Sequence, residues 1–423
     1  MQTFTPLEYL KIDVASSFGL DKENWETRIQ WFDDHETELR SLAALIEGGI
    51  RPKDLRQHPL MQDADQPAMF FAGLRAWLKA SRGEAIAYPI SLDATASGAQ
   101  LLAILISCEK SARLCNVIDT GKREDLYTNI HQLIAQRAAV QDVGLGDIER
   151  KDSKQSVMTS LYGSTRQPKR IYGEGELLEI FFETMEEEAT GIWELNQFLL
   201  DQWNPKAMSH DWVLPDNFHV QVKVIDDRIE GARFLGQIYD VTTKVNRPIP
   251  KSKSLSANVV HSVDGMVVRE MLRRCSYDAD RITELLRLLS RPVQTYLVTE
   301  TETENQKLVM TLWDLYKDTG FLSARILELL DETTIQLVDL DVITQMVKTL
   351  PTAPFPVMAV HDCFRCHPNH ANVLRKQYNQ VLHDIAQSEL LSSIISQLAN
   401  EPIRVEKLTD FADQVLKAEY ALS

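Results

Sequence analysis

The chain has 423 residues, of which 44% are hydrophobic and 25% charged, and its formal net charge is −16. This length exceeds the size at which one hydrophobic core stops growing, so two or three subdomains are expected, and the ordinary composition excludes collagen-like, mucin-like and disordered chains. No run of about 18 apolar residues predicts a membrane span, and the first residues lack a secretory signal, so we expect neither a membrane protein nor a secreted one.

The first 90 residues are predicted to be helical. Apolar residues recur there at helical spacing, as at Leu39, Leu42 and Ile46. Gly48 and Pro52 interrupt the pattern. We therefore expect several short helices in this segment.

A short apolar strand follows. It covers Ile86–Leu92 and ends at Asp93. Helical patterns then resume and continue to about residue 210, with a break at the glycines of Val143–Gly146.

The next segment predicts a β-hairpin. His219–Ile225 alternates with period two, Asp226–Gly231 is rich in turn-forming residues, and Ala232–Tyr239 returns. Further on, the acidic residues Thr299–Glu304 are interpreted as a solvated linker.

Two aspartates directly follow predicted strands. The second strand, Phe355–Val360, ends at His361 and Asp362, and helices are predicted beyond it. A pair of carboxylates such as Asp93 and Asp362 can hold two Mg²⁺ ions roughly 3.5 to 4 Å apart, which stabilise both oxygens of an in-line phosphoryl displacement. Taken singly, an aspartate at a strand end is more often a cap or a turn residue than a metal ligand.

A basic stripe is predicted on one helix. Residues at positions 150, 154, 158 and 162 each advance about 40° around the axis and about 6 Å along it. Arg150 and Lys154 can then grip a triphosphate, and Tyr162 lies about 12 Å beyond Lys154, near the sugar and base of a bound nucleotide. The alternative is an exposed amphipathic helix whose basic residues are merely solvated.

These elements together resemble a known family. A strand with Asp93, the R-x3-K-x7-Y-G pattern from Arg150 to Gly163, and a strand with His361-Asp362 occur in the order of motifs A, B and C of the single-subunit polymerases. This superfamily includes phage and mitochondrial RNA polymerases and the family A DNA polymerases. The segment Asp93–Gln100 is similar to the D-G-S-x-x-G-x-Q form of the RNA polymerases, and Asn258–Gly265 matches their N-x-x-H-S-x-D-G element.

The resemblance implies a role for single residues. Asp93 and Asp362 would bind two Mg²⁺ ions, with the Ala94 carbonyl as a further ligand. Arg150, Lys154 and Lys22 would neutralise the triphosphate, Tyr162 and His261 would sense the ribose, and His361 would support the metal site near the primer end. The implied reaction is DNA-templated transfer of nucleotides from NTPs to an RNA 3′-hydroxyl. A family A-like DNA polymerase and a catalytically inactive structural member of such an assembly are the rival readings.

The same resemblance implies an α+β, mostly helical fold: a right-hand polymerase palm and fingers with a small antiparallel palm sheet. The expected divisions of the chain are palm helices at 1–92, palm with motif A at 93–130, fingers at 131–275, an insertion at 276–354, and palm with motif C at 355–423.

The partners are also inferred from the resemblance. Family members carry a D-x-x-G-R element before an L-K-I helix, whereas Leu10-Lys11-Ile12 here lies almost at the first residue and D-x-x-G-R is absent. The chain therefore resembles the larger, catalytic subunit of the split RNA polymerase II of certain lytic podophages. We expect a second, more basic subunit with D-x-x-G-R, a single-stranded or opened DNA template, an RNA product, an accessory protein that delivers the template, and a location in the cytoplasm of the infected bacterial host.

The five cysteines are scattered and odd in number, which argues against a disulfide framework. Cys363, Cys366 and His367 match a haem attachment pattern, and with His370 they could be written as a zinc site. We expect neither haem nor zinc, because Cys363 lies beside a predicted catalytic aspartate and haem attachment needs an exported protein. The sequence leaves metal binding by this cluster open.

Overall fold

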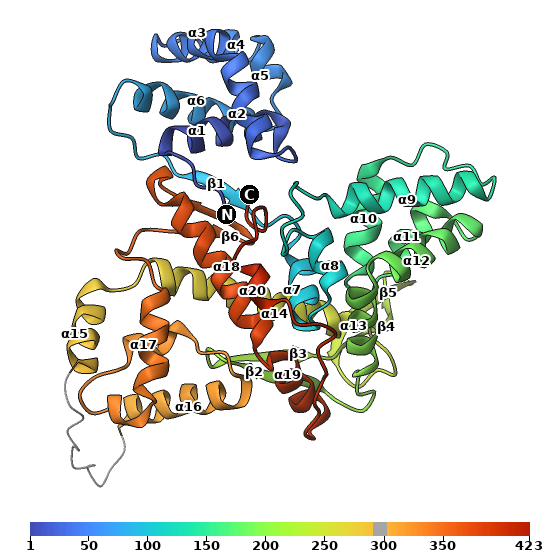
Figure 1. The fold of residues 1–423 in the computed structure, drawn as a ribbon. Helices are drawn as coiled ribbons and strands as arrows, with labels where there is room; N and C mark the ends of the chain where they lie inside the picture. Colours follow the sequence, from blue (N-terminus) through green and yellow to red (C-terminus); the bar gives the residue numbers. More distant parts are fainter. Residues whose placement is uncertain (291–302) are drawn as a thin grey trace.

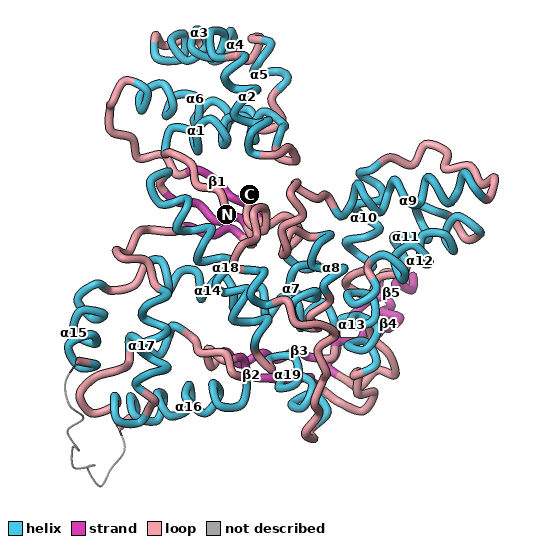
Figure 2. The backbone as a smooth tube through the Cα atoms, in the orientation of Figure 1, coloured by secondary structure: helices cyan, strands magenta, loops and turns pink. Residues whose placement is uncertain are grey.

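The computed structural model describes residues 1–290 and 303–423. Helices make up most of this part of the chain, and strands form only small antiparallel sheets (Figure 2). The predicted mostly helical α+β class is confirmed. Within the described ranges, no helix has both the length and the apolar character needed to cross a membrane.

The N-terminal segment forms a group of helices, as predicted, at the top of the view in Figure 1. They are α1 (Pro6–Ala15), a π-helical turn (Ser16–Leu20), α2 (Trp25–Asp34), α3 (Glu36–Glu47), α4 (Pro52–Leu55), α5 (Pro59–Asp63) and α6 (Pro67–Ser81). A capping box fixes the start of α1, because Thr5 and Glu8 each accept a hydrogen bond from the other's backbone. The break predicted at Gly48 and Pro52 is confirmed.

A three-stranded sheet lies below these helices and near both chain ends (Figure 1). Its order is β1 (Ile90–Asp93), β7 (Cys363–Cys366) and β6 (Met358–Val360). Both predicted strands are therefore shorter than expected. Residues 86–89 stay outside because Pro89 has no N–H to donate and β7 offers only four partners.

The helical stretch to about residue 201 also agrees with the prediction. It contains α7 (Ser97–Leu105), α8 (Glu109–Leu114), α9 (Leu126–Val140), α10 (Arg150–Ser160), α11 (Arg166–Tyr172), α12 (Glu176–Glu188) and α13 (Thr190–Asp201). The predicted break at the glycines falls between α9 and α10.

The predicted hairpin was wrong in its pairing. β3 (Phe218–Lys223) pairs with β2 (Ser209–Leu214), and β4 (Ile225–Phe234) pairs with β5 (Gln237–Asn246). The expected turn at 226–231 lies inside β4. The chain instead turns at Leu235 and Gly236, which adopt φ of 49° and 82°, the left-handed backbone of a two-residue hairpin turn.

The remaining elements are mostly helical. They are α14 (Ser254–Cys275), α15 (Ala279–Leu289), α16 (Glu304–Thr319), α17 (Leu340–Thr349), α18 (Ala371–Gln387), α19 (Leu390–Ala399), α20 (Ala412–Val415), and short 3-10 turns at Ala324–Glu328, Ile335–Leu337 and Pro368–His370. Most of the predicted linker, 299–302, lies outside the described residues, and Glu304 already begins α16. The last eight residues after α20 are not helical, contrary to the prediction; part of them instead pairs with the end of β1.

Two hydrophobic clusters hold the fold together. The main one joins the N-terminal helices, the central sheet, α7 and the long buried helices α14 and α18. A second cluster is built only from residues between 282 and 346, with Ile326 and Ile343 fully buried. The two are linked by hydrogen bonds, because the buried Glu270 on α14 accepts from the Ser323 hydroxyl and from the Ala324 N–H.

Candidate active site

The central sheet brings Asp93 and Asp362 together. β1 and β7 pair so that Asp93 faces Cys363, the residue after Asp362. The Ala94 N–H donates to the Asp362 carbonyl at 3.1 Å. His361 and Asp362 form the turn between β6 and β7, with His361 at φ 56°. Two carboxylates that are far apart in the sequence are thus held on adjoining backbone segments.

The charges at this place repel one another. Loss of hydration raises the pKa of the Asp93 carboxyl and the Asp362 charge raises it further, while a hydrogen bond with Cys363 acts in the opposite direction. The pKa of Asp264 on α14 is raised to about 6, first by burial and then by Asp362. Such a cluster is relieved by a bound cation.

The donor set fits a hard cation. Among the described residues, no group of three or more His, Cys, Asp or Glu side chains is arranged to hold a metal. Two carboxylates with a backbone carbonyl still suit Mg²⁺, which keeps several waters and completes its shell with substrate phosphates. Asp93 remains exposed to solvent, so water and a ligand can reach it.

Tyr162 and His261 form a second part of the site. Their ring centroids lie 5.2 Å apart. Tyr162 follows the last residues of α10, so the predicted single stripe from 150 to 162 on one helix was wrong at its end. A Cβ on Gly98 would lie 2.4 Å from the Tyr162 hydroxyl, so Gly98 is needed for the close approach. Burial raises the pKa of Tyr162, and the charges of Asp264 and Asp362 raise it further, which keeps the phenol protonated at neutral pH.

Arg150 and Lys154 both face the start of α9. Arg150 forms an ion pair with Asp125 and donates to the Thr128 hydroxyl at 2.6 Å. The Lys154 ammonium lies 5.3 Å from the ring centroid of Tyr127. Arg150 therefore already has an anionic partner, and a triphosphate has to compete with Asp125 for it.

Lys22 lies apart from these two, in the loop before α2. It is exposed and forms only a 3.7 Å ion pair with Asp21. Arg123 connects this loop to Ser423, whose backbone pairs with Asp93 at the end of β1. The Arg123 side chain donates to the Lys22 carbonyl at 3.3 Å and to the Ser423 hydroxyl at 3.2 Å.

Sequence reasoning missed three charged residues of this region. Asp264 lies inside the Asn258–Gly265 element, so its position in that motif could have identified it. Asp125 carries the signal of a helix cap, since it accepts from two backbone N–H groups at the start of α9. No pattern marks Arg123.

The cysteine and histidine cluster is divided by the fold. Cys363 interacts with the Asp93 carboxylate, whereas Cys366 is buried in the main cluster. The His370 ring stacks on Phe355 with centroids 4.5 Å apart, and the His367 and His370 centroids are 6.3 Å apart.

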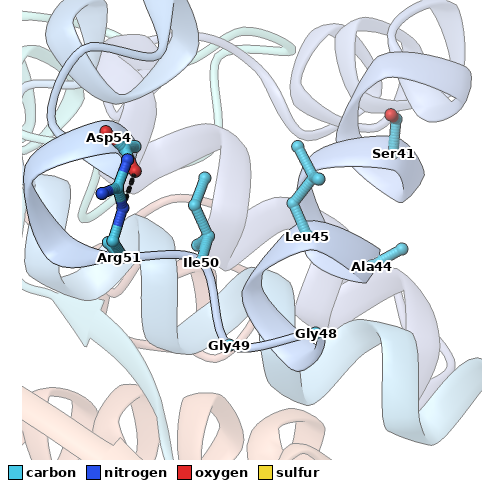
Figure 3. A pocket seen from close by; sticks show the side chains of 8 residues that line it. All are labelled: Ser41, Ala44, Leu45, Gly48, Gly49, Ile50, Arg51 and Asp54. Atoms are coloured by element: carbon cyan, nitrogen blue, oxygen red, sulfur yellow. Dashed lines mark hydrogen bonds and ion pairs between the residues drawn. The ribbon is translucent and has the colours of Figure 1, made fainter.

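A hollow elsewhere contains none of the predicted site residues. It has a volume of about 570 Å³ and is formed by α3, α4 and the connection between them (Figure 3). Leu45 and Ile50 line it together with an ion pair between Arg51 and Asp54. The carboxylate in this lining, Asp54, is already paired with Arg51, and Ser41 is the one hydroxyl among the lining residues.

Comparison with known proteins gives one consistent result. The model of a family described as DNA-dependent RNA polymerase matches residues 4–210. A "Probable DNA-directed RNA polymerase" of Neurospora crassa is 26% identical over 174 residues, which is 38% of this chain and 18% of that protein. "DNA-directed RNA polymerase 1, mitochondrial" of Arabidopsis thaliana is 29% identical over 180 residues, again 38% of this chain and 18% of that protein.

The family match contains the first half of the site. Asp93, Arg150, Lys154 and Tyr162 lie inside residues 4–210, whereas His261 and Asp362 lie beyond them. The alignments span less than a fifth of these relatives. Residues 4–210, with the first half of the candidate site, are therefore similar to the DNA-dependent RNA polymerase family, and 38% of the chain is similar to a mitochondrial RNA polymerase.

Proposed function

We propose that the chain catalyses DNA-templated RNA synthesis. An RNA 3′-hydroxyl attacks the α-phosphorus of an NTP, the new P–O bond forms as the bond to the β-phosphate oxygen breaks, pyrophosphate leaves, and the hydroxyl proton passes to solvent. The carrying observation is the 3.1 Å hydrogen bond from the Ala94 N–H to the Asp362 carbonyl, which holds the backbones of the exposed Asp93 and the half-buried Asp362 side by side.

The proposed cofactor is a pair of Mg²⁺ ions. Asp93, Asp362 and the Ala94 carbonyl would hold them, and such ions stabilise the charge on the attacking and leaving oxygens. The remaining contribution of the protein is positioning, because phosphoryl transfer needs little covalent work from side chains.

The basic residues would bind the triphosphate. Arg150 and Lys154 lie one helical turn apart on α10, and their charges match a chain of phosphates. When an NTP is bound, Arg150 would exchange Asp125 for a phosphate oxygen. Lys22 is a third candidate, on the other side of Arg123.

The sugar would be recognised by Tyr162 and His261. The Tyr162 hydroxyl is protonated and packs against Gly98, where a side chain would collide with it and displace the ring. A ribose 2′-hydroxyl would exchange hydrogen bonds with the Tyr162 hydroxyl and with a ring nitrogen of His261. This argument favours NTPs over dNTPs as substrates.

The finer assignments extend this proposal. We assign residues 1–130 and 355–423 to a polymerase palm, residues 131–275 to fingers, and residues 276–354 to an insertion. The acidic chain, with net charge −16, would work with a second, more basic polypeptide that supplies positive charge along the nucleic acid. The setting would be the cytoplasm of a phage-infected bacterium, with a template delivered in opened form.

Primer extension tests the function. The purified chain, alone and with co-expressed neighbouring gene products, is given a primed single-stranded DNA template with Mg²⁺ and either NTPs or dNTPs. RNA extension that needs Mg²⁺ and prefers NTPs is the expected result. Extension only with dNTPs would identify a DNA polymerase, and no extension in any combination would contradict catalysis. Full activity without a copurifying protein would remove the two-subunit part alone.

A further inference from the structure

β1 is an edge strand, and its outer edge is covered in an unusual way. On the inner side it pairs with β7. The N–H groups of Ser91 and Asp93 are two residues apart and so point to the same, outer side. The Asp93 N–H donates there to the Ser423 carbonyl at 3.2 Å. The Ser91 N–H donates at 2.8 Å to Oδ1 of Asp13, a side chain.

Asp13 is a buried carboxylate that has no part in the reaction proposed above. It lies on α1 and is 4% exposed. Its second oxygen, Oδ2, accepts a hydrogen bond from the Tyr88 hydroxyl at 2.7 Å. A Cβ on Gly73 of α6 would come within 3.2 Å of both Oδ2 and the Tyr88 hydroxyl, so the carboxylate is tightly enclosed.

The positive charge near Asp13 is shared with Asp93. Arg365 on β7 lies opposite Ser91, and its charge lowers the pKa of both aspartates, although burial is the largest influence on each and raises both. Its Nε is buried and has no hydrogen-bond partner. The charge of Arg365 therefore acts on Asp13 and on Asp93 together.

We propose that Asp13 is a positioning residue for Asp93. Its carboxylate takes the place of a neighbouring strand at Ser91 and fixes the backbone of β1 two residues before Asp93. The inference rests on the proposed function in one respect, namely that Asp93 is a metal ligand. Without Asp13 the outer edge of β1 would be held only at the backbone of Asp93. The Asp93 carboxylate would then lose its fixed direction.

The test uses two measurements on the ligand-free chain, neither of which needs RNA synthesis. The first is amide hydrogen exchange over residues 90–93. The second is binding of Mn²⁺, as a probe of the Mg²⁺ site, by electron paramagnetic resonance. The variants are Asp13→Ala and Asp13→Asn. The control is Asp33→Ala, which removes the exposed carboxylate on α2 that pairs with Lys11 on α1.

Asp13→Ala should speed exchange in this segment by about tenfold or more, because a hydrogen bond to a charged acceptor is lost. It should also weaken Mn²⁺ binding by about tenfold, the usual size for removing a group that orients a ligand. Asp13→Asn should stay close to wild type in exchange, since an amide oxygen still accepts from Ser91. The control should change neither measurement.

Unchanged exchange in folded Asp13→Ala would overturn the proposal, and so would an equal change in the control. Should Asp13→Ala fail to fold, Tyr88→Phe replaces it, since it removes one of the two hydrogen bonds that hold the carboxylate; unchanged exchange in that variant also overturns the proposal. A chain that makes no RNA but shows the expected exchange and Mn²⁺ effects would contradict the polymerase and support the role of Asp13.

Discussion

β1 and β7 pair over four residues, whereas β4 and β5 pair over ten. The short pair is enclosed: its apolar residues are buried, and its outer edge is covered by Asp13 and by the segment ending at Ser423. The long pair is open, with Ile229, Phe234 and Leu235 each at least 65% exposed. The length of a strand pair therefore does not decide how firmly the pair is held. Burial of its faces and coverage of its edges decide this.

The largest effect is expected at the enclosed pair. Asp93→Asn and Asp362→Asn should each reduce extension of a primed template by at least about a hundredfold, because each removes a charge that holds a cation at the reacting atoms. Circular dichroism should show a folded protein in both cases. Asp314→Asn, on the exposed face of α16, is the matched control. Extension by either site variant within about tenfold of wild type would contradict the assignment of the aspartates.

The open β4–β5 hairpin should affect the initiation of RNA synthesis but not the extension of a primer. Its residues 225–246 carry four acidic and three basic side chains, too little positive charge to grip a duplex. We therefore expect poor initiation on intact linear duplex and better initiation on opened or single-stranded template. Replacing residues 229–242 by Asn-Gly keeps Arg228 opposite Thr243 and should leave primed extension unchanged. Efficient initiation on duplex without added factors would oppose this view.

One methyl group added at Gly98 should disrupt the close packing beside Tyr162. Gly98→Ala should push the Tyr162 ring away, lower the free energy of unfolding by about 1 to 3 kcal/mol, and raise the KM for NTPs. Gly144→Ala is the matched control, since a Cβ there meets nothing within 4 Å. Thermal unfolding and steady-state extension measure both effects. Equal behaviour of the two variants would show that Gly98 is not needed for space.

A smaller effect is expected from the tyrosine itself. Tyr162→Phe keeps the ring beside His261 and removes only the hydroxyl. One neutral hydrogen bond contributes about 0.5 to 1.5 kcal/mol, so the use of dNTPs relative to NTPs should rise several-fold with little change in rate. Competition between NTPs and dNTPs in primer extension measures it. Selectivity equal to wild type would place Tyr162 away from the ribose.

The smallest effect is expected at the tip of the hairpin. Leu235 has a left-handed φ of 49° and is 86% exposed. Leu235→Asn should therefore stabilise the chain slightly, by at most about 0.5 kcal/mol, since asparagine tolerates this backbone and little burial is lost. Leu235→Val should do the opposite, because a β-branched side chain resists this φ. Chemical denaturation compares the two, and greater stability of the valine variant would contradict the turn geometry.

The helical segments and the places of Asp93 and Asp362 at strand ends could be predicted from the sequence, because each depends on a local pattern. The glycine breaks and the strand ends at Asp93 and Asp362 carry their own signals. The pairing of β1 with β7 joins residues some 270 positions apart, and only the order of the motifs indicated it.

Contacts between separate elements were not predicted where no local sequence pattern marks them. The residues at 226–231 look like a turn, yet Gly231 lies within β4, because the opposite strand supplies ten partners and Leu235-Gly236 can make the tighter turn. No pattern marks Asp13, since nothing in its sequence neighbourhood indicates that Ser91 and Tyr88 will meet it. Side chains that act across elements become visible only in three dimensions.

The second hydrophobic cluster has a practical consequence. Because it shares no member with the main cluster, the energetic effects of substitutions in the two should add. Met310 on α16 is 40% exposed, and four of the five native cysteines are buried. A cysteine placed at position 310 would therefore accept a fluorescent label ahead of those four, and the partly exposed Cys363 beside Asp93 would be its one native competitor.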